Sequence, residues 1–410
     1  MNPAARNLRL WGWAAPLGQA FFWAPVFFLY MNQYLPVEQV LQLEAAYYFA
    51  VVLCEVPSGY LSDRVGRILT LRISSLFGCL AYGLFFIGGD FTAFLLAQLA
   101  LAVHFSFRSG TDVAWHYELL EHEGLAHELA IRESRLARSA FAVRAACALV
   151  GGALGSMSLG APYALAFLTA LAVGGMMVAS RELPVSSEHR AGAFGTQLGR
   201  ALGRLADPWL AWIFAYVVLQ TTLEHIPYEF AQPYLAAVLG GAGIDIGNTP
   251  LATGVMVASV AMVGAVVAGW AEPLMRRFGV GGTLLGLTAL QTVMIGVLAT
   301  AVHPLLAVLL LLRSVQPAIG HIVVNATVAP RVPRAERATY LSIHSLAGRL
   351  GYSAVLLSLG VLVGGADAMG PRELRLLLGA SAALGTLGLL GLLVTRGLVR
   401  RAADKHDLAE

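Results

Sequence analysis

The chain has 410 residues, of which 58% are hydrophobic and only 12% are charged. Because soluble domains carry roughly a quarter charged residues, this composition excludes a water-soluble globular protein and indicates one that lies mostly in lipid. The formal net charge is +3, and the basic residues are spread along the chain instead of clustered, which argues against a nucleic-acid-binding protein. We therefore expect the lipid bilayer, and no nucleic acid, among its partners.

Apolar runs of membrane-spanning length recur along the whole chain. A helix needs about 20 mainly apolar residues to cross the hydrocarbon core. The first run extends to about Tyr34, which is too long for the core of a signal peptide, so it predicts a first spanning helix. The predicted spans are 11–34, 41–61, 68–88, 91–116, 136–158, 161–180, 208–239, 250–271, 281–301, 304–326, 338–363 and 373–396.

The longest polar interval, 181–207, separates six predicted spans from six. It predicts an N-terminal helical bundle over 1–180, a linker over 181–207 and a C-terminal bundle over 208–410. Within the linker, apolar residues from Phe194 to Leu205 recur at helical spacing, with Arg200 and Arg204 on the opposite face. This pattern is typical of an amphipathic helix that lies on a membrane surface.

The distribution of lysine and arginine predicts the orientation. If the N-terminus is cytoplasmic, most of the 27 basic residues fall in inner segments, and the outer loops hold only Arg372 and Arg375. Cytoplasmic loops carry such an excess of basic residues. We therefore expect both termini in the cytoplasm and the protein in a bacterial inner membrane.

A short charged turn is predicted after the second span. It reads Gly59-Tyr-Leu-Ser-Asp63-Arg64-Val-Gly66-Arg67. Its glycines permit a tight reversal, and Asp63 can pair with guanidinium groups. A degraded copy, Gly269-Trp-Ala-Glu272-Pro-Leu-Met-Arg276-Arg277-Phe-Gly279, follows the eighth span, which indicates an internal repeat.

The first turn resembles the signature loop of the major facilitator superfamily, G-x-L-a-D-R-x-G-R, with Ser62 in place of the usual alanine. Together with the span count and the repeated turn, the resemblance covers essentially the whole chain. It implies an all-α membrane protein, with twelve transmembrane helices in two pseudo-symmetric six-helix bundles, that works as a secondary transporter by alternating access. It also implies a cytoplasmic gate, whose residues would be Glu55, Gly59, Asp63, Arg64, Gly66, Arg67, Glu272 and Arg276.

The same resemblance implies that spans 1, 4, 7 and 10 line a central cavity. Charged residues inside a bilayer cost about 3 kcal/mol each on insertion scales, so they face protein or water. The sixth span carries none, whereas the fourth, seventh and tenth do. The expected residues of the substrate and proton cavity are Gln19, Trp23, Arg108, Asp112, Glu224, His225, Tyr228, Glu229, Arg313 and Gln316.

These charges leave two readings open. Arg108 and Asp112 are four residues apart and would share a helical face, where Asp112 either accepts a proton or forms a permanent structural pair. Glu224 and Glu229 either carry proton coupling and bind cationic substrate groups or belong to a structural network, with Arg313 as a candidate partner.

Helix packing can also be read from small residues and prolines. Gly151-Gly152-Ala-Leu-Gly155 in the fifth span predicts close helix contact. Superfamily antiporters carry a Gly-Pro motif on this helix, and the proline is missing here. Pro227 and Pro233 predict a bend in the seventh span.

No cofactor and no metal are expected. The run from His116 to Glu128 is rich in histidine and acid, but its spacing misses the zinc-protease pattern, so it predicts a solvated acidic loop near Arg132, Arg135 and Arg138. Cys54, Cys79 and Cys147 lie in apolar runs without metal-type spacing. Neither a Walker loop nor a Gly-x-Ser-x-Gly elbow is present, which argues against ATP-driven transport and serine hydrolase chemistry.

The leading hypothesis is a monomeric, proton-coupled exporter of a small, partly apolar organic compound. Proton-coupled uptake of an anionic metabolite is the alternative, favoured by Arg108, Arg313 and Arg349. A binding protein that does not transport and a membrane-embedded enzyme are the remaining possibilities.

Overall fold

The computed structural model describes residues 2–407 except 184–198, 201, 244, 333, 365 and 367, and omits some side chains within helices. All regular structure in the described residues is helical. The chain divides into two compact units, one of Met1–Glu188 with Gly243–Ala258 and one of His189–Ala242 with Ser259–Glu410. The amphipathic helix predicted from Phe194 onward lies mostly outside the described residues.

Within the described residues, eight helical stretches are long and apolar enough to cross a membrane by length and composition. One of them, Thr249–Thr300, covers two predicted spans. The predicted spans 11–34, 136–158 and 208–239 are missing from this set. The first and the last are interrupted helices, as described below, whereas 136–158 lies mostly in one continuous helix, Leu129–Gly155.

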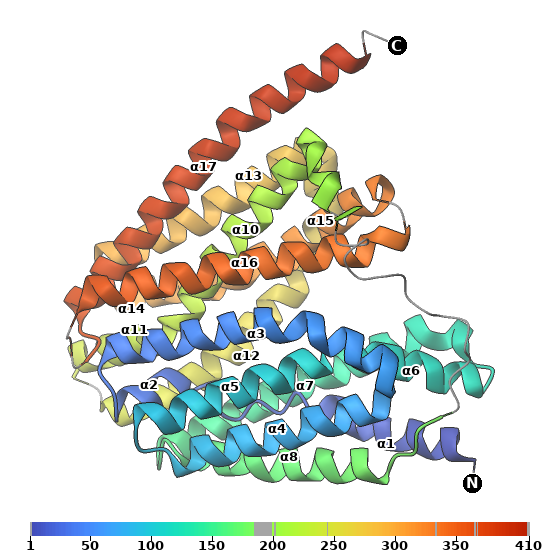
Figure 1. Ribbon diagram of the computed structural model, residues 1–410. Coiled ribbons are helices and arrows are strands. Elements are labelled where there is room, and N and C mark those ends of the chain that lie inside the picture. Colours follow the sequence, from blue (N-terminus) through green and yellow to red (C-terminus); the bar gives the residue numbers. More distant parts are fainter. Residues whose placement is uncertain are drawn as a thin grey trace. The chain divides into compact units, whose positions relative to one another are not determined.

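The first unit is a bundle of antiparallel helices. Its helices are α1 (Pro3–Leu17), α2 (Phe27–Asn32), α3 (Val37–Val65), α4 (Arg67–Ile87), α5 (Phe91–Arg108), α6 (Thr111–His122), α7 (Leu129–Gly155), α8 (Ala161–Ala179) and the start of α12 (Thr249–Val267). Helix α4 packs against both α5 and α8, and α3 packs against α5 (Figure 1). A buried cluster that includes Trp11, Leu71 and Trp115 joins α1, α4 and α6.

The predicted fourth span is two helices, α5 and α6. Helix α5 ends at Arg108, and Gly110 has φ +75°, a backbone conformation that glycine adopts at little cost. Arg108 and Asp112 therefore lie on either side of a break, so the prediction that they share one helical face was wrong. Helix α6 continues to His122, and much of the predicted acidic loop is consequently helical.

The second unit contains the remaining helices. They are α10 (Pro208–Glu229), α11 (Ala231–Gly241), the end of α12, α13 (Ala271–Thr300), α14 (Pro304–Ala307), the 3₁₀ helix η5 (Val308–Ser314), α15 (Val315–Arg331), α16 (Arg334–Val363) and α17 (Pro371–Asp407). Helix α10 packs against α16 and α17, and α13 packs against α17 and α15. Trp212, Leu284, Val323 and Tyr340 belong to the core of this unit.

The seventh span is interrupted where the prolines predict a bend. Helix α10 ends at Glu229, and α11 begins at Ala231, with Pro227 inside α10. A proline removes one backbone hydrogen bond and clashes with the preceding turn. The predicted bend is confirmed.

The signature turn is shorter than the sequence predicts. Helix α3 runs through Val65, so Gly59 is helical and the reversal falls on Gly66 alone, whose φ is +103°. In the second copy, Gly279 has φ +68° and breaks the helical geometry of α13. The two copies thus share a glycine in the left-handed region at the same place in the motif.

The glycines of α7 make the close contacts that their spacing predicts. A Cβ atom on Gly152 would lie 2.6 Å from the carbonyl oxygen of Pro250, and one on Gly151 would lie 2.0 Å from that of Phe22. On the other side of the first contact, a Cβ on Gly254 would lie 2.4 Å from the carbonyl oxygen of Ala148. Helices α7 and α12 therefore meet backbone to backbone within the first unit.

Candidate substrate and proton site

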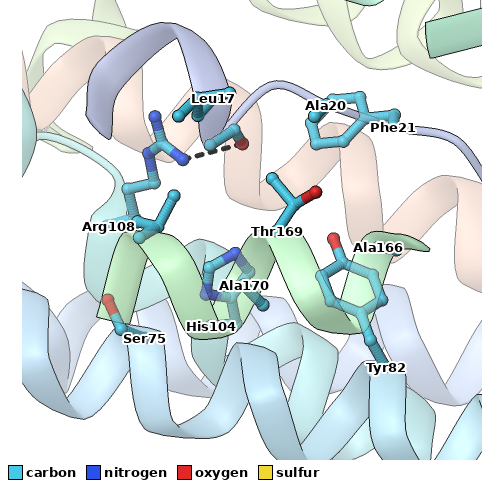
Figure 2. Close-up of a pocket in the computed structure, with 12 residues that line it drawn as sticks. Leu17, Ala20, Phe21, Ser75, Tyr82, His104, Arg108, Ala166, Thr169 and Ala170 are labelled. Atoms are coloured by element: carbon cyan, nitrogen blue, oxygen red, sulfur yellow. Dashed lines mark hydrogen bonds between the residues drawn. The ribbon is translucent and has the colours of Figure 1, made fainter. Parts of the chain in front are cut away.

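Arg108 in the first unit points toward the C-terminal end of α1 (Figure 2). Its Nη1 donates a hydrogen bond to the carbonyl oxygen of Gly18 at 2.8 Å, and its Nη2 donates to that of Ala15 at 3.0 Å. The carboxylate Oδ2 of Asp112 lies 3.8 Å from its Nε. Because the last carbonyls of a helix lack internal partners and carry partial negative charge, Arg108 acts as a C-terminal cap of α1.

A small cavity beside Arg108 holds a second ionisable group, His104. The cavity measures about 30 Å³ and is also lined by Phe21, Tyr82 and Thr169. Such a volume has room for about one water molecule and none for an organic solute. His104 is buried, and its Nδ1 lies 2.7 Å from the carbonyl oxygen of Ser74, which fixes the ring in place.

The remaining predicted residues of the first unit lie on the segment between α1 and α2. Arg144 of α7 donates from Nε to Oε1 of Gln19 at 3.0 Å. The ring of Trp23 lies 5.6 Å from that of Phe21 and 6.2 Å from that of Phe27. Gln19 therefore connects this irregular segment to α7, while Trp23 belongs to an aromatic cluster.

A larger polar cavity lies in the second unit, among α10, α15 and α16. Its volume is about 470 Å³, which is the size of a site for a small organic molecule. The side chains and glycine that line it are Tyr216, Val217, Gln220, Thr221, Glu224, His225, Gln316, Gly320, His321, Val324, Asn325, Leu341, His344, Ser345 and Arg349. Predicted residues Glu224, His225 and Gln316 thus come together in one wall.

Two contacts organise this wall. Oε1 of Glu224 lies 3.8 Å from Nδ1 of His225, and the Glu224 side chain is 19% exposed. Gln316 donates from Nε2 to the hydroxyl of Tyr216 at 3.3 Å. The site therefore combines a carboxylate, an imidazole and side-chain amides at the surface of a solute-sized space.

Tyr228, Glu229 and Arg313 are not among the residues that line this cavity. Arg313 lies over the ring of Tyr228, with 5.3 Å from Cζ to the ring centroid. Glu229 is fully buried, and Tyr352 donates to its Oε2 at 3.5 Å. Among the described residues, Arg313 contacts an aromatic ring and neither glutamate, so it is not the partner of Glu224 or Glu229 that the sequence suggested.

The predicted gate residues form local contacts within each unit. Arg67 forms an ion pair from Nε to Oε1 of Glu118 at 3.0 Å and donates from Nη1 to Ser62 at 2.9 Å. In the second copy, Glu272 pairs with Arg276 one helical turn away. The backbone carbonyl of Glu55 accepts a hydrogen bond from Ser58 at 2.9 Å. The side chains of Asp63 and Arg64 lie outside the described residues, as does the surface of Gly59.

Glu182, which follows α8, joins the first copy of the motif. Its Oε1 accepts a hydrogen bond from the backbone N–H of Ile68 at 3.4 Å, at the N-terminus of α4. A Cβ atom on Gly66 would lie 2.7 Å from the same oxygen. Partial burial raises the pKa of the Glu182 carboxyl above its ordinary value, while these backbone donors oppose the shift.

Among the described residues, no group of three or more His, Cys, Asp or Glu side chains could hold a metal ion. Glu128 of the predicted acidic run pairs with Arg132 at 2.8 Å, whereas Glu118 pairs with Arg67 and His116 is buried. The acidic run is therefore divided between the gate motif and a surface pair.

Sequence reasoning missed Gln220, His104 and the partners of the first motif, Glu118 and Glu182. Gln220 lies one helical turn from both Tyr216 and Glu224, so the polar face of α10 could have revealed it. His104 is an ionisable residue inside an apolar run, which is itself a functional signal. No local pattern connects Glu118 or Glu182 to a motif more than 50 residues away.

The fold and the cavity define an all-helical integral membrane protein of the solute-carrier class. The chain belongs to the Major Facilitator Superfamily, whose family model matches residues 13–356. This is a family of secondary transporters and not of enzymes.

Solved transporters share the fold at low sequence identity. The nucleoside transporter NupG superposes with a TM-score of 0.77 at 12% identity, covering 96% of this chain and 99% of that chain. An auto-inhibited POT family peptide transporter gives 0.71 at 14% identity, with 97% of each chain covered. A bacterial homologue of the iron transporter ferroportin gives 0.65 at 16%, covering 95% of this chain and 98% of that chain. No curated protein matches the sequence.

Proposed function

We propose that the protein is a proton-coupled exporter of a small organic compound and that the 470 Å³ cavity of the second unit holds part of the substrate site. The observation that carries the proposal is the position of Glu224, a half-buried carboxyl group in that wall beside His225. A carboxyl group in a membrane-spanning helix is costly to keep charged, so binding and release of a proton there can be coupled to solute occupancy.

The proposal includes alternating access, in which the two copies of the signature motif close one side of the carrier. Support comes from the ion pairs Arg67–Glu118 and Glu272–Arg276, since each copy of the motif contributes to one of them. Asp63 would strengthen this gate when the protein opens to the outside. In Asp63→Asn, we expect a changed turnover and a changed ratio of inward-open to outward-open protein.

The deciding experiment compares Glu224→Gln with the wild type in proteoliposomes. Glutamine keeps the shape but cannot bind and release a proton. We therefore expect loss of transport driven by a pH gradient, with substrate counterflow at equal pH retained. Glu44→Gln is the matched control, because Glu44 is buried on α3, accepts a hydrogen bond from Gln98 at 2.8 Å and is not among the residues that line this cavity. Gradient-driven transport that persists in Glu224→Gln would overturn proton coupling through this residue.

Uptake of an anionic metabolite is the second candidate, and Arg349 is the observation that favours it. Arg349 lines the cavity, and a guanidinium group can bind a carboxylate through two hydrogen bonds. Arg108 and Arg313 support it less, because Arg108 caps α1 and Arg313 lies over Tyr228. Flux measured in both directions in oriented vesicles separates export from uptake, and counterflow separates either from binding without transport.

A further inference from the structure

Several buried polar atoms of the cavity wall lack hydrogen-bond partners. Oε1 of Gln316 and both ring nitrogens of His344 have no partner among the described residues. Gln316 is 2% exposed, and His344 is 3% exposed. Because an unpaired buried polar group costs free energy, such a cluster in one cavity marks a place where a ligand supplies the missing partners.

The unpaired atoms are held in defined positions. Nε2 of Gln316 is used in its bond to Tyr216, which leaves Oε1 as the free acceptor. The ring of His344 lies 5.2 Å from that of Phe214 and 4.4 Å from that of Tyr340, so packing restricts its orientation. Because these side chains are already held in place, a ligand that pairs with them costs little side-chain conformational entropy on binding.

The charges of the wall compensate one another. Its charged and titratable groups are Glu224, His225, His321, His344 and Arg349, which come from α10, α15 and α16. While Glu224 is ionised and the histidines are neutral, the Glu224 carboxylate and the Arg349 guanidinium give the wall no net formal charge. Glu224 has His225 beside it, and Arg349 also has an interaction partner. In that state a charged solute would find no excess of opposite charge on this wall.

We propose that the cavity selects an uncharged solute with an amide-like edge, a hydrogen-bond donor next to an acceptor, and that Gln316 and His344 are specificity-determining residues. This inference rests on the proposed function, since it takes the cavity as the substrate site. The free Oε1 of Gln316 can accept from the donor of such an edge, and the ring N–H of a neutral His344 can donate to its acceptor. Neutral carboxamides and heterocyclic amides carry this edge. Nicotinate lacks it, because a carboxylate replaces the amide, whereas orotate keeps the edge of uracil and adds a charge.

Matched probes test the proposal in the purified full-length protein. Nicotinamide and nicotinate differ only by amide against carboxylate, uracil and orotate differ by one added carboxylate, and 1-methylnicotinamide supplies a cation of the same shape. We expect nicotinamide or uracil to raise the thermal midpoint at concentrations where the charged analogues have no effect. In Gln316→Leu, we expect the affinity for the neutral probe to fall about tenfold or more, as for one lost hydrogen bond.

Two further variants make the outcome decisive. His344→Phe keeps an aromatic ring in the same packing, and it should lower the affinity for the neutral probe as Gln316→Leu does. Gln42→Leu removes a glutamine amide whose partner is Glu38, outside the cavity, and should bind as the wild type does. The proposal is overturned if the charged analogues bind as tightly as the neutral ones, if neither neutral probe binds, or if Gln316→Leu and His344→Phe both bind like Gln42→Leu.

The binding assay needs no pH gradient, so it fails or succeeds independently of proton coupling. Binding of nicotinate or orotate with coupling intact would remove the substrate class and leave the exporter standing. Binding of a neutral probe together with gradient-driven transport in Glu224→Gln would leave the substrate class and remove the coupling residue.

Discussion

At the residue scale, Glu182 shows how one side chain can support the signature motif. It accepts the N–H of Ile68 at the positive end of α4 and fills the space beside Gly66, where any side chain would collide with it. Arg67 of the same motif pairs with Glu118. The first copy is therefore held by two acids from other helices, one after α8 and one in α6.

The raised pKa of Glu182 predicts a pH-dependent stability. Because the folded-state pKa lies above the ordinary carboxyl value of about 4.3, the folded state binds this proton more tightly than the unfolded state does. The stabilisation of the folded state by this proton is therefore complete below the ordinary carboxyl pKa and is lost as the pH rises through the raised pKa. In Glu182→Gln, we expect the decline in stability over this pH range to disappear.

The measurement is the thermal midpoint of the detergent-solubilised protein at a series of pH values from mildly acidic to neutral. Glu121→Gln, which changes an exposed acid of α6, is the control and should keep the wild-type profile. Parallel profiles of Glu182→Gln and the wild type would contradict the assignment.

At the scale of elements, breaks in helices place the functional groups. The interruption at Ser109 and Gly110 lets Arg108 reach the end of α1, and the one after Glu229 separates α10 from α11. Helix α1 ends at Leu17, so the carbonyl groups of Ala15 and Gly18 can accept from Arg108. Half-helices at membrane depth occur where they line cavities or are buried in protein.

The contact between α7 and α12 gives the element-scale prediction. A methyl group on Gly152 would lie 2.6 Å from the carbonyl oxygen of Pro250, which is backbone and cannot rotate away. We expect Gly152→Ala to destabilise the protein by about 1–3 kcal/mol, the usual cost of overpacking. Gly175→Ala in α8 has open space around its Cβ and should be neutral or stabilising by up to about 1 kcal/mol. The measurement is the thermal midpoint of each variant. Equal midpoints for Gly152→Ala and Gly175→Ala would disprove the tight contact between α7 and α12.

At the scale of the whole molecule, membership in the Major Facilitator Superfamily means that the chain moves solutes across a bilayer as a secondary transporter. The orientation in the bilayer stays a prediction from the basic residues. It places the loop at Asp245 outside and the loop at His127 in the cytoplasm. Both residues are exposed.

Cysteine labelling tests this orientation. In a variant whose three native cysteines are replaced by alanine, we expect Asp245→Cys to react with a membrane-impermeant maleimide in intact cells. His127→Cys should react only after the cells are permeabilised. The reverse pattern would mean that the chain is inserted the other way, and labelling of both from outside would mean that the number of crossings between them is even.

The sequence by itself determined the class and the fold. Apolar runs, the excess of basic residues in alternate loops and the duplicated glycine–acid–arginine turn are all local patterns, and each has one physical meaning in a bilayer. The close approach of α7 through Gly152 and the bend near Pro227 were equally readable, because small side chains and prolines act on the backbone next to them. These features need no knowledge of which helices are neighbours.

Only the tertiary structure decided which polar groups meet. Arg108 forms the predicted ion pair with Asp112, but it also donates to the carbonyl groups of Gly18 and Ala15 at the end of α1, which no sequence pattern indicates. Gln220, Gln316 and His344 come from three helices and share one cavity wall. The unpaired atoms of Gln316 and His344 become visible only when the helices are packed. Whether a buried polar atom has a partner depends on the neighbours that the fold supplies and not on the residues beside it in the chain.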